Sequence, residues 1–249
     1  MKDGLHLSAR VYMQDLFTGF KQERNTIYHS INEEYFKEFC HKNNFFLAEK
    51  RENVNLYHVV YWLYNQFKSY KCFYMDFQDK NGFEIFNECK DSFSPNCACF
   101  SIMLNDLLIS MGLNSKAVWC LSGIPGDTEC HALNHVHIPS TNTWITVDPS
   151  SRSIICDKDG KPLDLLTIRN TILNGGKVFP HRNKSIRQPP DFIDEYNKYM
   201  KKNLFQFLTH FEQGLSYPLD HRAILIHPIG TNVIMNKTWQ KTSDISYLF

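Results

Sequence analysis

The spacing of apolar residues changes at Gly112, and this change limits the folds open to the chain. Over residues 100–111 apolar side chains recur at intervals of three and four, which is typical of a helix with a buried side. Gly112 is placed to end that helix. The next apolar segment, KAVWCL (116–121), is continuous and short, which indicates a buried strand. Asn105 and Asp106 fall on the other side of the expected helix.

Two segments of alternating polarity follow this strand. They are CHALNHVHI (130–138) and TWITVD (143–148), and they predict a hairpin with its turn centred between Pro139 and Ser140. Helices and antiparallel strands in separate blocks indicate an α+β fold, in which the helix over 97–111 packs on an antiparallel sheet.

Other elements follow from the same patterns. Residues 53–68 form an amphipathic helix with Leu56, Val59, Val60, Leu63 and Phe67 on one stripe. We expect further helices over 164–176 and, capped by Asp191, over 191–211, and strands over 223–229 and 232–235. Because no linker or repeat is visible, the sequence predicts one domain over 1–249.

Composition limits the partners. The 27 Lys and Arg residues nearly balance the 26 Asp and Glu residues, and a net charge of +1 creates no field that attracts nucleic acid or an acidic membrane. No signal peptide or membrane-spanning run is visible, so we expect a cytoplasmic protein. Its eight cysteines should then be mostly free thiols.

Cys97 and Cys99 flank one alanine where the helix over 97–111 begins. A helix N-terminus stabilises a thiolate through unsatisfied N–H groups and the positive end of the helix dipole, so Cys97 is a candidate nucleophile. A buried thiol, a zinc ligand and a redox partner are the alternatives. Two ligands one residue apart on a helix point in nearly opposite directions, which disfavours the zinc site and the redox pair.

The hairpin supplies the partners that such a nucleophile needs. With the turn centred between Pro139 and Ser140, His131 and Asp148 become direct cross-strand neighbours. A carboxylate there orients an imidazole, which in turn serves as the base for a thiol. His135 and His137 share the strand face of His131, and we expect both to be surface or edge residues.

These residues also match a known family. Residues 96–120, NCACFSIMLNDLLISMGLNSKAVWC, resemble the cysteine motif of the transglutaminase-like superfamily, in which a catalytic Cys opens a helix that ends in Gly before a strand. Residues 130–150, CHALNHVHIPSTNTWITVDPS, resemble its other two motifs, a strand opening with the catalytic His and a second reading Trp and then Asp-Pro. Residues 157–176 and 196–207 resemble the C-terminal half of uncharacterised bacterial members.

The resemblance implies a papain-like α+β core and a triad of Cys97, His131 and Asp148. The core would span about 53–160, with an N-terminal extension over 1–52 and a C-terminal elaboration over 161–249. By analogy with true transglutaminases, Trp62 is a candidate oxyanion donor on the preceding helix, and Gln66 is a second. The family pattern differs at Leu133 and His135, where many members carry an aromatic and an acidic residue.

Two functions follow from this sequence. The first is a thiol-dependent acyl-transfer enzyme acting on an amide of a peptide or protein, without a cofactor or metal, with hydrolysis favoured over transamidation. No calcium-loop pattern is visible. The second is a binding module that keeps the fold but does not turn over a substrate. The changed residues around His131 support this second hypothesis.

Overall fold

The computed structural model describes most of the chain from residue 52 onward. The described residues are 52–67, 80–124, 127–182, 186, 188–210, 223–228, 240–243 and 248. The first 51 residues and the strand expected over 232–235 lie outside these ranges.

The described helices are α3 (Glu52–Asn65), α4 (Gly82–Cys89), α5 (Cys97–Ser110), α6 (Leu165–Leu173) and α7 (Phe192–Asn203). The described strands are β1 (Ser115–Leu121), β2 (Cys130–Ile138), β3 (Thr143–Asp148), β4 (Ser153–Cys156), β5 (Phe179–Arg182), β6 (Gln206–His210), β7 (Ala223–Ile226) and β8 (Gln240–Thr242).

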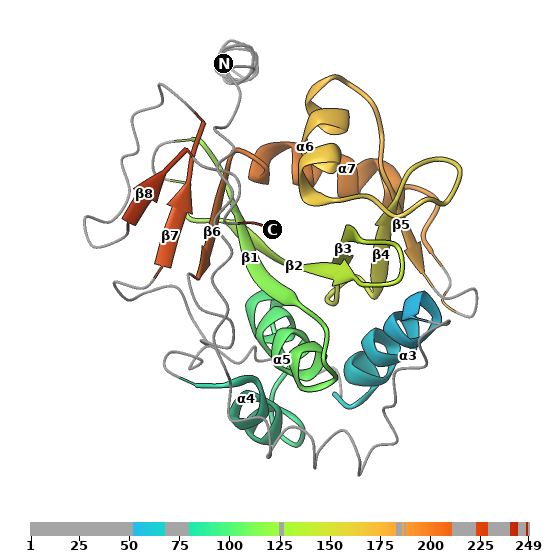
Figure 1. The fold of residues 1–249 in the computed structure, drawn as a ribbon, viewed down its shortest axis with the longest axis vertical. Helices are drawn as coiled ribbons and strands as arrows, with labels where there is room; N and C mark the ends of the chain where they lie inside the picture. The colour runs from blue at the N-terminus through green and yellow to red at the C-terminus, as the bar shows by residue number, and fades with distance from the viewer. Residues whose placement is uncertain are drawn as a thin grey trace.

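The strands form one sheet in the order β5-β4-β3-β2-β1-β6-β7-β8. Every neighbouring pair from β5 to β7 is antiparallel, and β8 runs parallel to β7 at the edge. The fold is therefore α+β, as the sequence indicated, with β1 and β2 near the centre of the sheet (Figure 1).

Helices cover both faces of this sheet. Alternate residues of β1 separate cleanly, with Trp119 packing among α3, α4 and α5 and Val118 packing among α6 and α7. Figure 1 shows the same division, with α3, α4 and α5 on one side of the strands and α6 and α7 on the other. Both faces of the central strands are thus buried, which explains why 116–121 is apolar without alternation.

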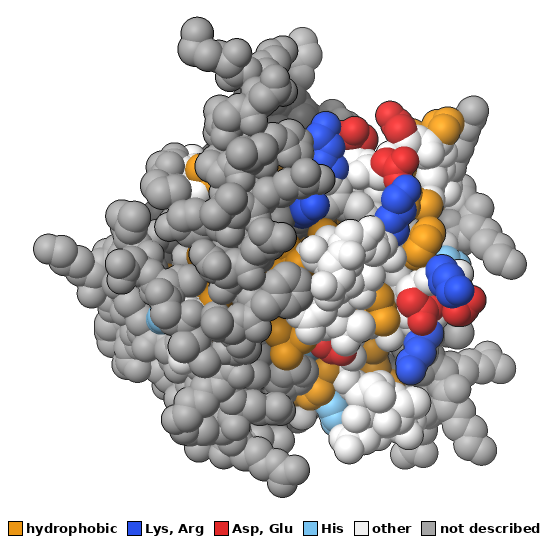
Figure 2. Space-filling model, turned by 90° about the horizontal axis from the view of Figure 1, so that it is seen from above, with side chains coloured by type: hydrophobic (Ala, Val, Ile, Leu, Met, Phe, Trp, Pro, Cys, Tyr) orange, Lys and Arg blue, Asp and Glu red, His pale blue; other side chains and the backbone are white. Residues whose placement is uncertain are grey.

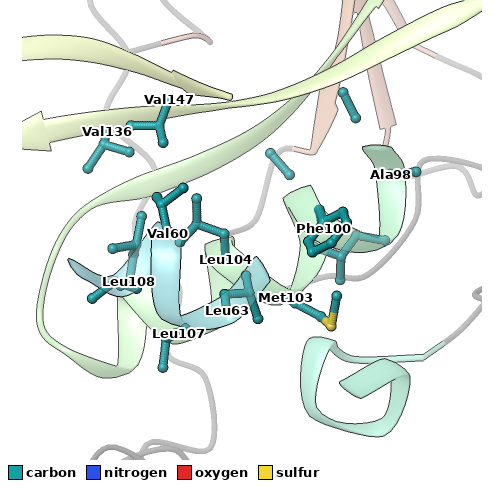
Figure 3. Packing of buried hydrophobic residues seen from close by; sticks show 14 of the residues in the cluster. Val60, Leu63, Ala98, Phe100, Met103, Leu104, Leu107, Leu108, Val136 and Val147 are labelled. Carbon is teal, nitrogen blue, oxygen red and sulfur yellow. The ribbon is translucent and has the colours of Figure 1, made fainter. Parts of the chain in front are cut away.

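α5 is buried on all sides. Its side chains from Ala98 to Leu108 are all buried, and Figure 3 shows Leu104 and Leu108 beside Val60 of α3, below β2 and β3. The polar side that the sequence predicted at Asn105 and Asp106 is therefore not exposed. Asp106 Oδ2 instead accepts a hydrogen bond of 2.6 Å from the first amide of α4. Gly112, with φ +86°, ends the helix as expected.

α4 was not predicted from the sequence. Asn81 caps it by accepting hydrogen bonds from Phe83 N–H and Glu84 N–H, while the Glu84 side chain accepts the Asn81 N–H. A side chain at Gly82 would stand 2.7 Å from Met103 Cα, so the absence of a Cβ lets α4 approach the backbone of α5 closely.

The predicted β2–β3 hairpin forms, but its turn lies one residue later than expected. Asn134 pairs with Val147, which centres the turn between Ser140 and Thr141. Asn142 adopts φ +50° there, a left-handed conformation that Asn tolerates well. Because the shift changes each pairing by two residues, every side chain keeps its predicted face.

The helix predicted over 191–211 is wrong in its second half. α7 ends at Asn203, and the following segment is β6, which lies between β1 and β7. Phe207 packs among α6 and α7 while Leu208 packs on the α5 side, so strand pairing buries both neighbours. The Asp191 side chain makes no capping hydrogen bond, although it occupies the N-cap position.

Charged residues of both signs share the described surface over α6 and α7 (Figure 2). Lys177 forms an ion pair with Asp194, and Lys198 forms one with Glu195. This part of the surface therefore has no field of a single sign.

No helix in the described ranges is long and apolar enough to cross a bilayer.

Candidate active site

Cys97 is the first residue of α5, and Asn96 holds that end of the helix in place. Asn96 Oδ1 accepts a 2.9 Å hydrogen bond from Cys99 N–H, and the Asn96 carbonyl accepts one from Phe100 N–H. Within the described residues the Cys97 N–H has no acceptor. The sulfur and this amide thus lie together at the positive end of the α5 dipole.

β2 extends past the end of the β2–β3 ladder, and His131 lies in this extension. The ladder begins at Asn134 opposite Val147, so His131 is a diagonal and not a direct neighbour of Asp148. The two still share a face, and His131 Nε2 donates a 2.8 Å hydrogen bond to Asp148 Oδ2. His131 is 8% exposed and Asp148 is fully buried, so water screens this contact little.

Asp148 is held by the turn that follows β3. Its second oxygen, Oδ1, accepts hydrogen bonds from Ser150 Oγ at 2.7 Å and from Ser151 N–H at 3.0 Å. Burial alone would raise the pKa of Asp148. The charge and hydrogen bond of His131, aided by the two serines, instead lower this pKa to about 2. Asp148 is therefore a carboxylate whose two oxygens are both engaged.

His131 is in turn favoured in its charged form. Burial disfavours an imidazolium, but the charge and hydrogen bond of Asp148, followed by those of Cys97, raise the pKa of His131 to about 10. Because Nε2 faces the carboxylate, Nδ1 is the ring nitrogen left for the thiol.

Cys97 has a lowered pKa despite its surroundings. Burial would raise the pKa of the thiol, but hydrogen bonding and charge from His131, together with the Ala132 N–H, lower it below the ordinary value. Ala132 lies in the part of β2 beyond the β3 ladder, so its amide is available to the sulfur. The site thus favours a thiolate–imidazolium pair.

Cys99 differs from Cys97 in every respect that matters for reactivity. It is fully buried, and a hydrogen bond with Cys89, followed by burial, raises the pKa of Cys99 far above the ordinary range. The helix turns its side chain into the α4–α5 contact, away from His131. Cys99 is therefore a core thiol.

α7 contributes two tyrosines to the surroundings of the His131–Asp148 pair. The Tyr199 ring meets the His131 ring edge-on, with centroids 5.4 Å apart, and its hydroxyl donates to the Cys130 carbonyl. Burial and the nearby Cys97 charge raise the pKa of Tyr199. Tyr196 is buried close enough to Asp148 for the carboxylate charge, after burial, to raise the pKa of Tyr196. α7 thus shields the His131–Asp148 pair from solvent.

The structure does not bring Trp62 to the first turn of α5. Trp62 stacks on Phe86 with ring centroids 5.9 Å apart and lines a small apolar cavity with Met103 and Leu107. These residues lie along the second and third turns of α5, which places Trp62 away from Cys97. Gln66 Nε2 donates to the Trp62 carbonyl within α3, and its oxyanion role stays a prediction.

The other histidines of β2 lie apart from this site. His135 is fully buried, so the expectation that it would lie on the surface is wrong. Its Nδ1 donates to the Leu248 carbonyl, and its ring packs against Trp144. His137 is half-buried and donates to Asn142 Oδ1. In the described ranges no group of three or more His, Cys, Asp or Glu residues is placed to hold a metal ion.

Comparisons with known proteins add little to this description. No protein-family model matches the sequence, and no curated protein matches it. Among solved structures, Legionella pneumophila LapG in an EGTA-treated form is similar to 69% of this chain and 98% of its own, at 13% identity and a TM-score of 0.31.

We expect the His131→Ala substitution to slow iodoacetamide labelling of Cys97 at pH 7 by about ten-fold or more, because burial then raises the pKa of the thiol. Labelling rates should be measured by mass mapping over a pH series. The pH at which the rate increases should be higher in the variant than in the wild type. The His137→Ala variant serves as the control and should match the wild type. Equal Cys97 rates with and without His131 would contradict this account.

The loss of stability caused by the Asp148→Asn substitution should depend on pH. The lowered pKa of Asp148 contributes stability above about pH 4 that is lost as pH falls toward 2, and the raised pKa of His131 contributes stability below about pH 6.5 that is lost as pH rises toward 10. Urea unfolding should therefore show the largest loss, about 3 kcal/mol, between about pH 4 and 6.5.

The matched control for this prediction is Asp194→Asn, which breaks an exposed ion pair with Lys177. Its loss should stay below about 1 kcal/mol. If the loss in Asp148→Asn were independent of pH, the buried ion pair would not be the source of the stability.

Proposed function

We propose that this protein is a thiol-dependent acyl-transfer enzyme acting on amide bonds of peptides or proteins, with Cys97, His131 and Asp148 as its triad. The observation that carries the proposal is the hydrogen bond from His131 to the buried Asp148 carboxylate, together with the action of that same His131 in lowering the pKa of the Cys97 thiol. A lone structural thiol needs neither a base nor a second group to orient that base.

The chemistry follows from these contacts. The Cys97 thiolate attacks the substrate carbonyl, and the His131 imidazolium then protonates the leaving amine, which leaves a thioester. Asp148 holds the ring and stabilises its charged form. The neutral imidazole next takes a proton from water, which attacks the thioester and releases the acid. Water is the favoured acceptor in this proposal, and an amine in its place would give transamidation.

In this proposal the N-terminus of α5 stabilises the oxyanion. The Cys97 N–H lacks an acceptor in the described part of the protein and lies beside the sulfur, where the negative oxygen develops during attack. The α5 dipole favours the same charge.

The order of elements supports a papain-like transglutaminase core for this enzyme. A helix opening with the nucleophile is followed by β1, by β2 with His131 near its start, and by β3 with Asp148 at its end. The departures from the family pattern do not alter this site, because Leu133 packs under α6 and α7 and His135 packs beside Leu248.

The proposed reaction is tested by incubating the full-length protein with a mixed peptide library in isotopically labelled water, with and without added pentylamine. We expect new peptide carboxyl groups that carry the label, and mass spectrometry should find none with Cys97→Ala. Cys99→Ala, which removes the neighbouring core thiol, should keep the activity. Products formed equally by Cys97→Ala would overturn the proposal, and peptide binding without turnover would indicate the binding module.

A further inference from the structure

Two arginines lie at the end of the sheet that carries the candidate triad. In an antiparallel sheet the start of one strand lies beside the end of the next, so His131, Asp148 and Arg182 reach the same end of the sheet. Ser153 of β4 pairs with Asp148 on one side and with Arg182 on the other. Arg152 stands in the turn between β3 and β4.

Each guanidinium lies over an aromatic ring. Arg152 Cζ lies 4.2 Å from the centre of the Tyr64 ring, and Arg182 Cζ lies 3.8 Å from that of Phe192. Tyr64 also stacks on Phe100, which is one helical turn from Cys97. Aromatic stacking fixes the plane of a guanidinium and leaves its edge free to bind an anion.

Neither arginine has an anionic partner among the described residues. Both Nε atoms are buried without a hydrogen-bond partner there, and no described carboxylate forms an ion pair with either side chain. The negative charge of Asp148 acts on Arg182. The oxygens of Asp148, however, already accept hydrogen bonds from His131, Ser150 and Ser151.

The two positive charges also act on each other. Burial, followed by the charge of Arg152, lowers the pKa of Arg182. Two close cations that are partly buried are unfavourable unless an anion joins them.

A cavity of about 610 Å³ opens beside Arg182, and it is also lined by Phe179, Gln188 and Ile193. Asp157 and Asp159 line it as well, together with Lys158. Asp157 follows Cys156 at the far end of β4, about 13 Å along the strand from the Arg182 end. Its Oδ1 accepts hydrogen bonds from Asp159 N–H and Lys161 N–H within its own turn. The Arg182 end of the cavity is therefore the end suited to an anion.

We propose that Arg152 and Arg182 form a carboxylate-binding site for the substrate, on the Asp148 side of Cys97. The site selects peptides that carry a carboxylate a few residues from the amide that Cys97 attacks. The carboxylate comes from an acidic side chain or from the C-terminus of the peptide, since a guanidinium binds both alike. This inference rests on the proposed function, which supplies the nucleophile.

The test uses chloroacetyl peptides, which alkylate Cys97 as its sulfur forms a bond to carbon and chloride leaves. The reference peptide is neutral, with Gln at the tested positions and an amidated C-terminus. In one series a single Glu replaces Gln at successive positions. In a second series Gln is kept and the C-terminus is a free carboxylate. We expect a carboxylate at one position to speed Cys97 labelling about ten-fold or more at low salt. Added salt should reduce this preference in the wild type.

Variants assign the preference to the two arginines. Arg152→Gln and Arg182→Gln should each reduce the carboxylate preference to about two-fold or less, with each rate divided by the rate at which neutral iodoacetamide labels the same variant. Arg182→Lys keeps the charge but loses the planar fork, so it should keep part of the preference. Lys90→Gln makes the same charge change at the exposed end of α4 and should have no effect. Thermal unfolding checks that each variant is folded.

A binding measurement separates this inference from the proposed function. If iodoacetamide labels Cys97 slowly, the nucleophile assignment fails, and titration calorimetry of Cys97→Ala with the acetylated peptides then tests the carboxylate site alone. Tighter binding of the carboxylate peptide, lost in Arg182→Gln, supports the site. The inference is overturned if no carboxylate position is preferred, or if the preference survives removal of both arginines.

Discussion

The hydrogen bond between His131 Nε2 and Asp148 Oδ2 is the contact on which the rest of the site depends. Asp148 is fully buried, and its second oxygen is occupied by Ser150 and Ser151, so the His131 ring supplies the opposite charge that this carboxylate needs. Because Nε2 is held by the carboxylate, Nδ1 is the ring nitrogen that remains for Cys97. The pKa of the thiol is lowered through this arrangement, although burial acts in the opposite direction.

The site forms where the two layers of the fold meet at one end of the sheet. Cys97 comes from α5, on one face, whereas His131 and Asp148 point to the face covered by α7. They meet because β2 continues beyond its ladder with β3, which leaves His131 and the Ala132 amide accessible to the end of α5. Tyr199 of α7 closes the other side of the imidazole.

Much of this arrangement follows from the sequence because it depends on local periodicity. The change of spacing at Gly112 predicted α5 and β1, and alternation predicted β2 and β3 with His131 and Asp148 on one face. The exact pairing did not follow, since the Ser140–Thr141 turn depends on the left-handed Asn142. His131 and Asp148 still share a face of the sheet because the pairing shifted by two residues, an even number.

Other features required tertiary information. β6 lies in the second half of the helix predicted over 191–211, and only its pairing with β1 decides for a strand. α4 has a local sequence signal, the capping box of Asn81 and Glu84, but its packing on α5 depends on tertiary contacts. The contact of Tyr199 with His131 joins residues far apart in the sequence, and no pattern within one helix indicates it.

The central claim is that Cys97 accepts an acyl group with the help of His131, and intact-protein mass spectrometry after mixing with p-nitrophenyl acetate tests it most directly. The account predicts rapid addition of one acetyl group to Cys97 at neutral pH, with release of one nitrophenolate, and loss of both in Cys97→Ala and His131→Ala. Acetylation spread over several residues, or a Cys97 thioester that forms equally fast without His131, would contradict it.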